Sequence, residues 1–240
     1  MLCYLHCLLT PDWITALGTV GAVAAALVIA LFGKQMGQWF FRPKLDLDAV
    51  VRRPDAEKVG RFQMVGPAYR PIGEAWFFRL AIMNSADAPA RDVQVYLRRV
   101  EKADGSVVDK FTPMNLKWTN SGETTRKVLL RGVPVFCDFI HITDPASRSI
   151  SGEDLNTVPA GQGVMALDVE AVNTANGHLH GPGAYLFHLL LAGENFSARS
   201  FAVKVTYNGA WYAEQDRMFD QAIGFRMEKL ARPPKHPARA

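Results

Sequence analysis

Residues 201–208 have the sequence FAVKVTYN, in which large apolar side chains at the odd positions alternate with alanine, lysine, threonine and asparagine at the even positions. Successive side chains of a β-strand point to opposite faces of its sheet, so this alternation predicts a strand that buries one face. Similar strand patterns occur along the rest of the chain. They predict further strands at residues 45–51, 75–83, 93–98, 135–142, 164–170 and 184–192.

Turn-forming residues end these stretches, and no long amphipathic helix separates them. Parallel strands need such crossover helices, so the pattern favours an antiparallel β-sandwich of the immunoglobulin-like class over residues 44–224. An up-and-down barrel is the alternative. Residues 54–73, rich in proline and glycine, and residues 114–127 are predicted to form long loops, with a short edge strand at 116–118.

The composition excludes several classes of protein. The 240-residue chain has 49% hydrophobic and 21% charged residues with a mean hydropathy close to zero, which fits neither a disordered chain nor a membrane protein with many spans. Its three cysteines, Cys3, Cys7 and Cys137, are too few for a disulfide scaffold. The odd number favours reduced thiols, as in a cytosol.

An uncharged stretch near the N-terminus has a different character. Residues 13–32, WITALGTVGAVAAALVIALF, contain 20 residues without a charge, and a helix of that length spans about 30 Å of hydrocarbon. Trp13 at its start and Trp39 beyond its end have the amphipathic aromatic side chains typical of the two membrane interfaces. The sequence therefore predicts a transmembrane helix at residues 13–33.

Positive charges predict the orientation of this helix. Residues 1–12 contain no lysine or arginine, whereas basic residues follow the helix closely. Because positive flanks stay in the cytoplasm, we expect a short extracytoplasmic N-terminus at residues 1–12, a juxtamembrane segment at 34–43 and a cytoplasmic C-terminal domain. A cleaved signal peptide is the alternative, but it would need a basic segment before the apolar stretch. The side chains expected to contact the membrane surface are Lys34, Arg42, Lys44 and Trp39.

Small residues recur every four positions within the predicted helix, at Gly18, Ala22, Ala26 and Ala30. Such a stripe lets two helix backbones approach closely, so we expect a homo-oligomer formed through this face. The alternative is that glycine and alanine are simply frequent in transmembrane helices.

The C-terminal residues 225–240 carry five basic residues against one acid and contain three prolines. Prolines prevent regular structure, so a basic tail is predicted. It would either touch the anionic lipid surface or remain solvated and support solubility.

Candidates for chemistry are few. His178 and His180 form the best local pair for a metal, but no second pair, CxxC or HExxH motif accompanies them, so no metal or other cofactor is expected. His141, Asp168 and Glu170 complete the only set of side chains that could form an enzymatic or ligand-binding site. Nucleic acid is not an expected partner, because the aromatic residues fall on presumed core faces despite a pI near 9.0.

Three stretches together resemble a family of proteins. They are WITALGTVGAVAAALVIALFG at residues 13–33, FFRLAIMNSADAPARDVQVYL at 77–97 and GVPVFCDFIHITDP at 132–145. They are similar to bacterial single-pass inner-membrane proteins of unknown function that carry a cytoplasmic immunoglobulin-like β-sandwich. The resemblance implies this location and this domain, and it carries over no functional residue.

Together these observations predict a membrane-anchored, non-catalytic interaction module that recruits a protein partner and contacts membrane lipid. Two alternatives stay open. One is a ligand-binding or enzymatic domain with its site in the long loops, and the other is a structural subunit of a membrane complex.

Overall fold

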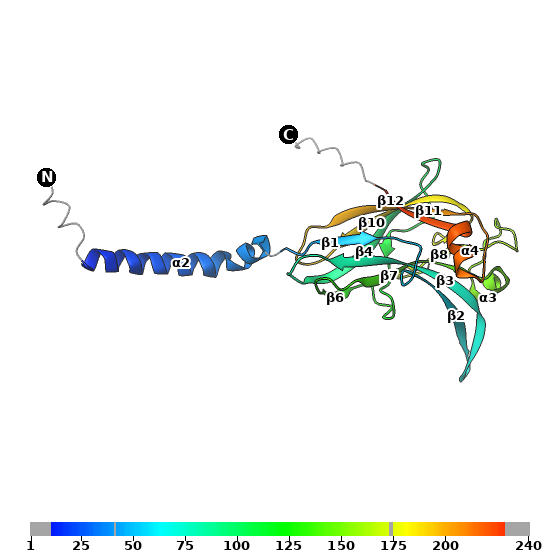
Figure 1. Ribbon diagram of the computed structural model, residues 1–240, viewed down its shortest axis with the longest axis horizontal. Helices are drawn as coiled ribbons and strands as arrows, with labels where there is room; N and C mark the ends of the chain where they lie inside the picture. The colour runs from blue at the N-terminus through cyan, green and yellow to red at the C-terminus, as the bar shows by residue number, and fades with distance from the viewer. Residues whose placement is uncertain (1–10, 41, 173–174, 229–240) are drawn as a thin grey trace. The chain divides into compact units, whose positions relative to one another are not determined.

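The computed structural model describes residues 11–40, 42–172 and 175–228, without the side chains of residues 11–12 and 33–40 (Figure 1). The chain divides into two compact units, one ending at Arg42 and one beginning at Pro43. Each unit is described by itself.

The first unit contains the helix α2, Pro11–Phe40. Every side chain from Trp13 to Phe32 is exposed, and this window has a mean hydropathy of 2.3. The helix is long and apolar enough to cross a membrane, a property that membrane anchors share with signal sequences. It continues to Phe40, through most of the predicted juxtamembrane segment, because no proline interrupts the chain before Pro43.

The second unit consists mainly of two six-stranded sheets in which all strand pairs are antiparallel. In the first sheet β3 pairs with β7 on one side and with β1 and β2 on the other. Its strands are β1 (Leu45–Asp48), β2 (Ala56–Val65), β3 (Ala68–Asn84), β7 (Val135–Thr143), β8 (Met165–Leu167) and β9 (Leu179–His180).

The second sheet has the order β12-β11-β10-β4-β5, with β6 paired to β4. Its strands are β4 (Ala90–Lys102), β5 (Met114–Asn115), β6 (Arg126–Leu129), β10 (Gly183–Ala192), β11 (Arg199–Tyr207) and β12 (Ile223–Glu228).

The mainly β, antiparallel prediction is confirmed, but the immunoglobulin-like sandwich is not, because the first sheet is curled into a half-barrel. Register shifts lie along β3, at Phe78/Arg79 against β7 and opposite Arg61/Phe62 of β2. Such irregularities bend a strand and increase its twist, which accounts for the curl.

One hydrophobic core joins the two sheets. Phe139 of β7 packs edge-on against Phe187 of β10 at 5.1 Å between ring centroids, and Phe78 of β3 lies 5.5 Å from Phe225 of β12. Aromatic contacts of this kind add to the free energy of apolar burial. Cys137 is also buried here, where a free cysteine packs as a small apolar residue.

Short helical turns complete the second unit. They are η1 (Pro145–Ser147), α3 (Arg148–Ser151), α4 (Gln215–Arg217) and the π-helical turn η2 (Met218–Ala222). Ser147 of η1 lies against Gly73 of β3 so closely that a β-carbon at Gly73 would come within 2.2 Å of the Ser147 hydroxyl oxygen. The turn therefore fixes β3 at this point.

A strand forms at every place where the alternation predicted one, including β11 (Arg199–Tyr207) at the predicted stretch 201–208. The predicted boundary of the tail is wrong, because β12 extends the domain to Glu228. The rest of the tail and residues 1–10 lie outside the described residues. Residues 114–127 are irregular apart from β5, the start of β6 and bridges at Leu116 and Trp118.

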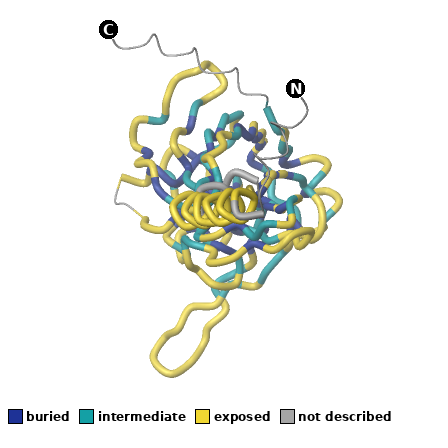
Figure 2. Tube along the Cα trace, turned by 90° about the vertical axis from the view of Figure 1, so that its left-hand side faces the viewer, coloured by how far each residue is buried: buried dark blue, intermediate teal, exposed yellow. Residues whose placement is uncertain are grey.

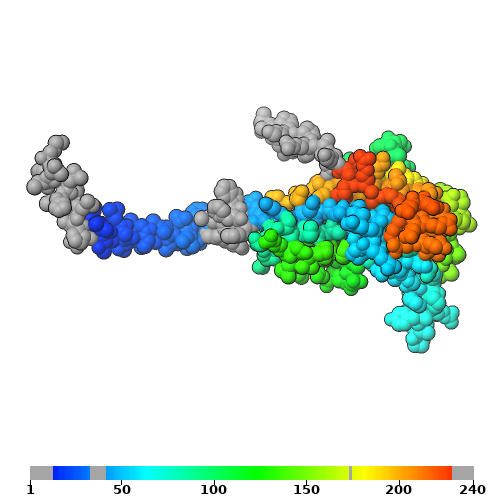
Figure 3. All heavy atoms as spheres, viewed as in Figure 1, coloured from blue at the N-terminus to red at the C-terminus, as the bar shows by residue number. Residues whose placement is uncertain are grey.

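The prediction of a long loop at residues 54–73 is wrong. Its greater part forms a hairpin between β2 and β3 that projects from the unit, at the bottom of Figures 1 and 2 and as the cyan protrusion of Figure 3. We call residues 60–73 the arm. Residues 62–71 are exposed without interruption, and a strand with two exposed faces lacks the burial pattern that reveals strands in a sequence.

The inter-sheet aromatic contacts predict a large effect of one truncation. Phe139→Ala is expected to lower the free energy of unfolding by about 3–5 kcal/mol, because it leaves a cavity between the sheets. Leu130→Ala, at a side chain that is 59% exposed, is expected to change it by less than about 0.5 kcal/mol. Urea unfolding of both variants measures this difference, and equal effects would contradict the assignment of the core.

Candidate functional site

A cluster of buried polar residues lies on the outer face of the first sheet. His141 and Thr143 occupy alternate positions of β7, whereas Ile140 and Ile142, which alternate with them, belong to the hydrophobic core. The period of two along the strand therefore turns both polar side chains away from the core. The ring of Phe77 on β3 stacks on His141, with 5.0 Å between the ring centroids.

Two carboxylates hold the His141 ring from opposite sides. Its Nδ1 lies 3.0 Å from Oδ2 of Asp168, which follows β8, and its Nε2 lies 2.9 Å from Oε1 of Glu153, which follows α3. Both nitrogen atoms donate only when the ring is protonated. The arrangement therefore favours an imidazolium ion bound between two carboxylates.

This geometry changes the proton affinity of the cluster. Burial alone would lower the pKa of His141, but the charge of Asp168 and the bonds to both carboxylates outweigh it and raise the pKa to about 9. Burial would likewise raise the pKa of Glu153, but its bonds to His141 and Thr143 and the charge of Arg61 lower the pKa to about 2. Near neutral pH both residues are therefore charged.

Arg61 completes the cluster from the base of the arm. Its guanidinium donates to Oε1 of Glu153 at 2.6 Å and to the hydroxyl of Thr143 at 2.7 Å, and Thr143 in turn donates to Glu153. Two cations, the His141 imidazolium and the Arg61 guanidinium, thus face two carboxylates, those of Glu153 and Asp168. The charges of the cluster compensate each other.

A cavity of about 280 Å³ lies beside the cluster and is also lined by Lys117 and His178. The Ser151 hydroxyl in this cavity donates to the carbonyl of Arg148 at 2.9 Å and to Glu153 at 3.3 Å, so it is not bonded to His141. A general base needs a free ring nitrogen directed at the proton that it removes. Both nitrogens of His141 are engaged, so this arrangement holds a proton and positions its neighbours.

The candidates from the sequence are only partly brought together. His141, Asp168 and His178 line the same cavity, whereas His180 lines a separate cavity of about 710 Å³. Glu170 accepts a hydrogen bond from Asn115 at 3.2 Å and lines neither of these cavities.

The local sequence gives no indication of two members of the cluster, Glu153 and Arg61. Glu153 follows an irregular turn, and Arg61 lies within the stretch predicted to be a loop. The two residues form a hydrogen bond although 92 positions separate them in the sequence. Only the tertiary fold brings them together.

His178 lies between strands β8 and β9, and His180 lies in β9. Both side chains are buried. Burial lowers the pKa of His180 to about 4, which leaves its ring neutral. Its ring packs against Tyr185 and Phe187 at 5.1 and 5.8 Å. Within residues 11–40, 42–172 and 175–228, no group of three His, Cys, Asp or Glu side chains converges on a point that could hold a metal ion.

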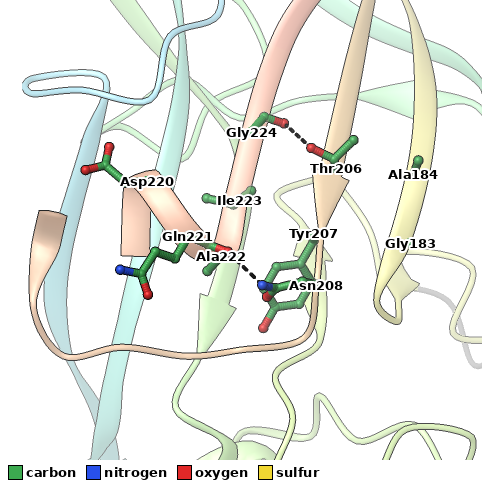
Figure 4. A pocket seen from close by; sticks show the side chains of 10 residues that line it. All are labelled: Gly183, Ala184, Thr206, Tyr207, Asn208, Asp220, Gln221, Ala222, Ile223 and Gly224. Carbon is green, nitrogen blue, oxygen red and sulfur yellow. Dashed lines mark hydrogen bonds between the residues drawn. The ribbon is translucent and has the colours of Figure 1, made fainter. Parts of the chain in front are cut away.

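A third cavity, of about 380 Å³, lies among the ends of β10, β11 and β12 (Figure 4). The Thr206 hydroxyl donates to the carbonyl of Gly224 at 3.5 Å, and the Asn208 amide donates to the carbonyl of Gln221 at 2.7 Å. These polar side chains are used to join β11 to the neighbouring segment. The Asp220 carboxylate is the one acidic group in its lining.

The residues predicted to act at the membrane lie in and after α2. Gly18, Ala22, Ala26 and Ala30 are all exposed along the helix. Arg42 and Lys44 are also exposed. The side chains of Lys34 and Trp39 lie outside the described residues.

Comparison with protein-family models, with curated proteins and with solved structures gives no match. The function is therefore inferred from the chain's own geometry and chemistry.

The ion pairs predict how stability depends on pH. The folded state keeps the His141 proton up to a pKa of about 9, whereas the unfolded chain loses it near 6.5, so the stabilisation is full below pH 6.5 and is lost as the pH rises through 9. The low pKa of Glu153, about 2 against 4.5, gives a stabilisation that is full above pH 4.5 and is lost as the pH falls towards 2. Urea unfolding measured between pH 2 and pH 9 is expected to show both losses of the free energy of unfolding.

His141→Gln is expected to remove the decline between pH 6.5 and 9 and to destabilise the fold by about 3 kcal/mol at pH 6, because a carboxylate is left without its charged partner. His188→Gln, on the other sheet, controls for the loss of a histidine and is expected to keep the decline. An undiminished decline in His141→Gln would contradict the assignment.

Proposed function

We propose that this protein is a membrane-anchored, non-catalytic recruitment module that displays its β unit to a protein partner at the cytoplasmic face of a bacterial inner membrane. The observation that carries the proposal is that every side chain from Trp13 to Phe32 is exposed. A continuous apolar surface of this size is unfavourable in water and favourable in hydrocarbon. A bilayer accommodates it without any other partner.

The β unit supports recruitment more than catalysis. The charges of its buried polar cluster are paired with each other, and the ring nitrogens of His141 are engaged by carboxylates. Large apolar side chains are instead exposed on the arm, at Phe62, Met64 and Tyr69. Exposed apolar groups that are continuous on a surface mark sites of interaction.

The distribution of charge supports the cytoplasmic location of the β unit. Lysine and arginine are absent from residues 1–12, whereas Arg42, Lys44, Arg52 and Arg53 follow the helix. A helix with this asymmetry is retained with its C-terminal flank in the cytoplasm.

Cysteine labelling in spheroplasts tests the anchor and its orientation. Cys137 cannot report, because its thiol is fully buried. Val172, whose side chain is 67% exposed, offers a better position. In a chain with Cys3→Ser and Cys7→Ser, Val172→Cys is expected to react with a membrane-impermeant maleimide only after the membrane is permeabilised.

Two results of this experiment would contradict the proposal. Labelling before permeabilisation would place the β unit on the other side of the membrane. An intact mass that lacks the first residues, together with release by carbonate, would identify the helix as a cleaved signal sequence.

Self-association through the helix is a separate part of the proposal. Gly18→Leu with Ala22→Leu is expected to convert a homo-oligomer in detergent into monomers, because leucine prevents close approach of the backbones. Leu17→Ala with Val28→Ala changes exposed helix residues outside the small-residue stripe and is expected to preserve the oligomer. Light scattering measures the mass, and an unchanged mass in the leucine variant would refute this interface.

A further inference from the structure

The arm has one apolar face that nothing in the described chain covers. The strand register places Phe62 opposite Pro71 and Met64 opposite Tyr69. Directly opposite residues of an antiparallel pair lie on the same face, so these four form a continuous patch. Phe62, Met64 and Tyr69 are 62%, 63% and 69% exposed. The space-filling view shows the arm standing clear of the unit (Figure 3).

The arm also has a free strand edge. Among the described residues, strand β2 pairs with β3 alone, and β7 joins β3 only from Ala75, beyond the arm. Alternate residues of an edge strand direct amide and carbonyl groups outwards. β2 contains no proline, whereas β3 carries Pro71 within the arm. The edge of β2 is therefore the better template for another strand.

The charge of the arm indicates the chemistry of its partner. No acidic residue occurs from Lys58 to Gly73. Lys58 pairs with Glu74, and Arg61 pairs with Glu153, but no ion pair involves Arg70 among the described residues. A second copy of the arm would bring another Arg70 and no acid. The surface is complementary to an acidic segment.

The position of the arm separates it from the point where the chain enters the β unit. The amide of Lys44 bonds to the side chain of Asn84, at the C-terminal end of β3, whereas the arm holds the N-terminal end of the same 17-residue strand. This strand extends about 50 Å along its path. Within the β unit, the arm and the entry point of the chain therefore lie at opposite ends of β3.

The base of the arm is fixed to the unit. A two-stranded hairpin is only marginally stable by itself, but the Arg61–Glu153 ion pair and the contact of Gly73 with Ser147 hold this one at its base. The arm is therefore presented in a defined direction. A binding surface that is ordered in advance loses less entropy on association.

We propose that the free edge of β2 in the arm binds an extended, acidic segment of a partner protein by strand addition. Apolar side chains of that segment cover the face formed by Phe62, Met64, Tyr69 and Pro71. A glutamate on the opposite face of the added strand lies two strand spacings, about 10 Å, from Arg70, which is within the combined reach of the two side chains. The inference rests on the proposed function as a recruitment module and names its binding surface.

Two synthetic peptides test this inference with the full chain in nanodiscs of zwitterionic lipid. One peptide alternates valine with glutamate, and the other has lysine in place of glutamate. Fluorescence anisotropy is expected to show that the glutamate peptide binds at least about fivefold more tightly. Arg70→Glu is expected to reverse this preference.

Paired variants separate the arm from the rest of the surface. Phe62→Ser with Met64→Ser is expected to weaken binding of the glutamate peptide, whereas Leu130→Ser, at an exposed position outside the arm, is expected to leave it unchanged. Near-ultraviolet circular dichroism verifies that each variant is folded. Hydrogen exchange is expected to slow at the outward amides of β2 when the peptide is bound.

The inference is overturned if neither peptide binds, if both bind equally, or if Arg70→Glu leaves the preference unchanged. Arm-dependent dimers in light scattering, or arm-dependent binding to anionic vesicles without peptide binding, would identify a second copy or lipid as the occupant instead. The peptide result does not depend on the location of the chain. A failed topology experiment would therefore refute the membrane anchor and leave the proposed binding surface intact. A failed peptide experiment would refute the binding surface and leave the membrane anchor intact.

Discussion

The double ion pair of His141 with Asp168 and Glu153 connects more parts of the β unit than any other polar interaction described above. It joins the central strand β7 to the segments that follow β8 and α3, and Glu153 extends the connection to Arg61 at the base of the arm. Buried charges are tolerated only when each has a partner. The direction in which the arm leaves the sheet therefore depends on this set of mutually compensating charges.

Three physical environments divide the chain. The core between the sheets buries aromatic and aliphatic side chains and gives the β unit its stability. The helix exposes apolar side chains all around, and its length and hydropathy suit a bilayer. The arm exposes one apolar face and one strand edge, both of which a further strand satisfies. In the proposed function, stability, anchorage and recruitment thus reside in separate segments.

The sequence predicted the elements that are buried on one face and missed those that are not. Strand β11 was evident because its alternation reflects the core, but the arm lacks such a signal, and Gly66 and Pro67 at its turn resemble a loop. The curl of the first sheet depends on register shifts that no residue pattern marks. His141 and Asp168 were identifiable as chemical groups, whereas Glu153 and Arg61 acquire their role only through contacts distant in the chain.

Hydrogen exchange of the arm in native membranes tests the central claim most directly. The same chain is measured in native membranes and in vesicles of the same lipids that contain this chain alone at equal density, with β11 as a protected reference. The account predicts slow exchange at the outward amides of β2 in native membranes and fast exchange in the vesicles, because lipid and second copies are present in both. Equal exchange in the two preparations would contradict recruitment of a partner by the arm.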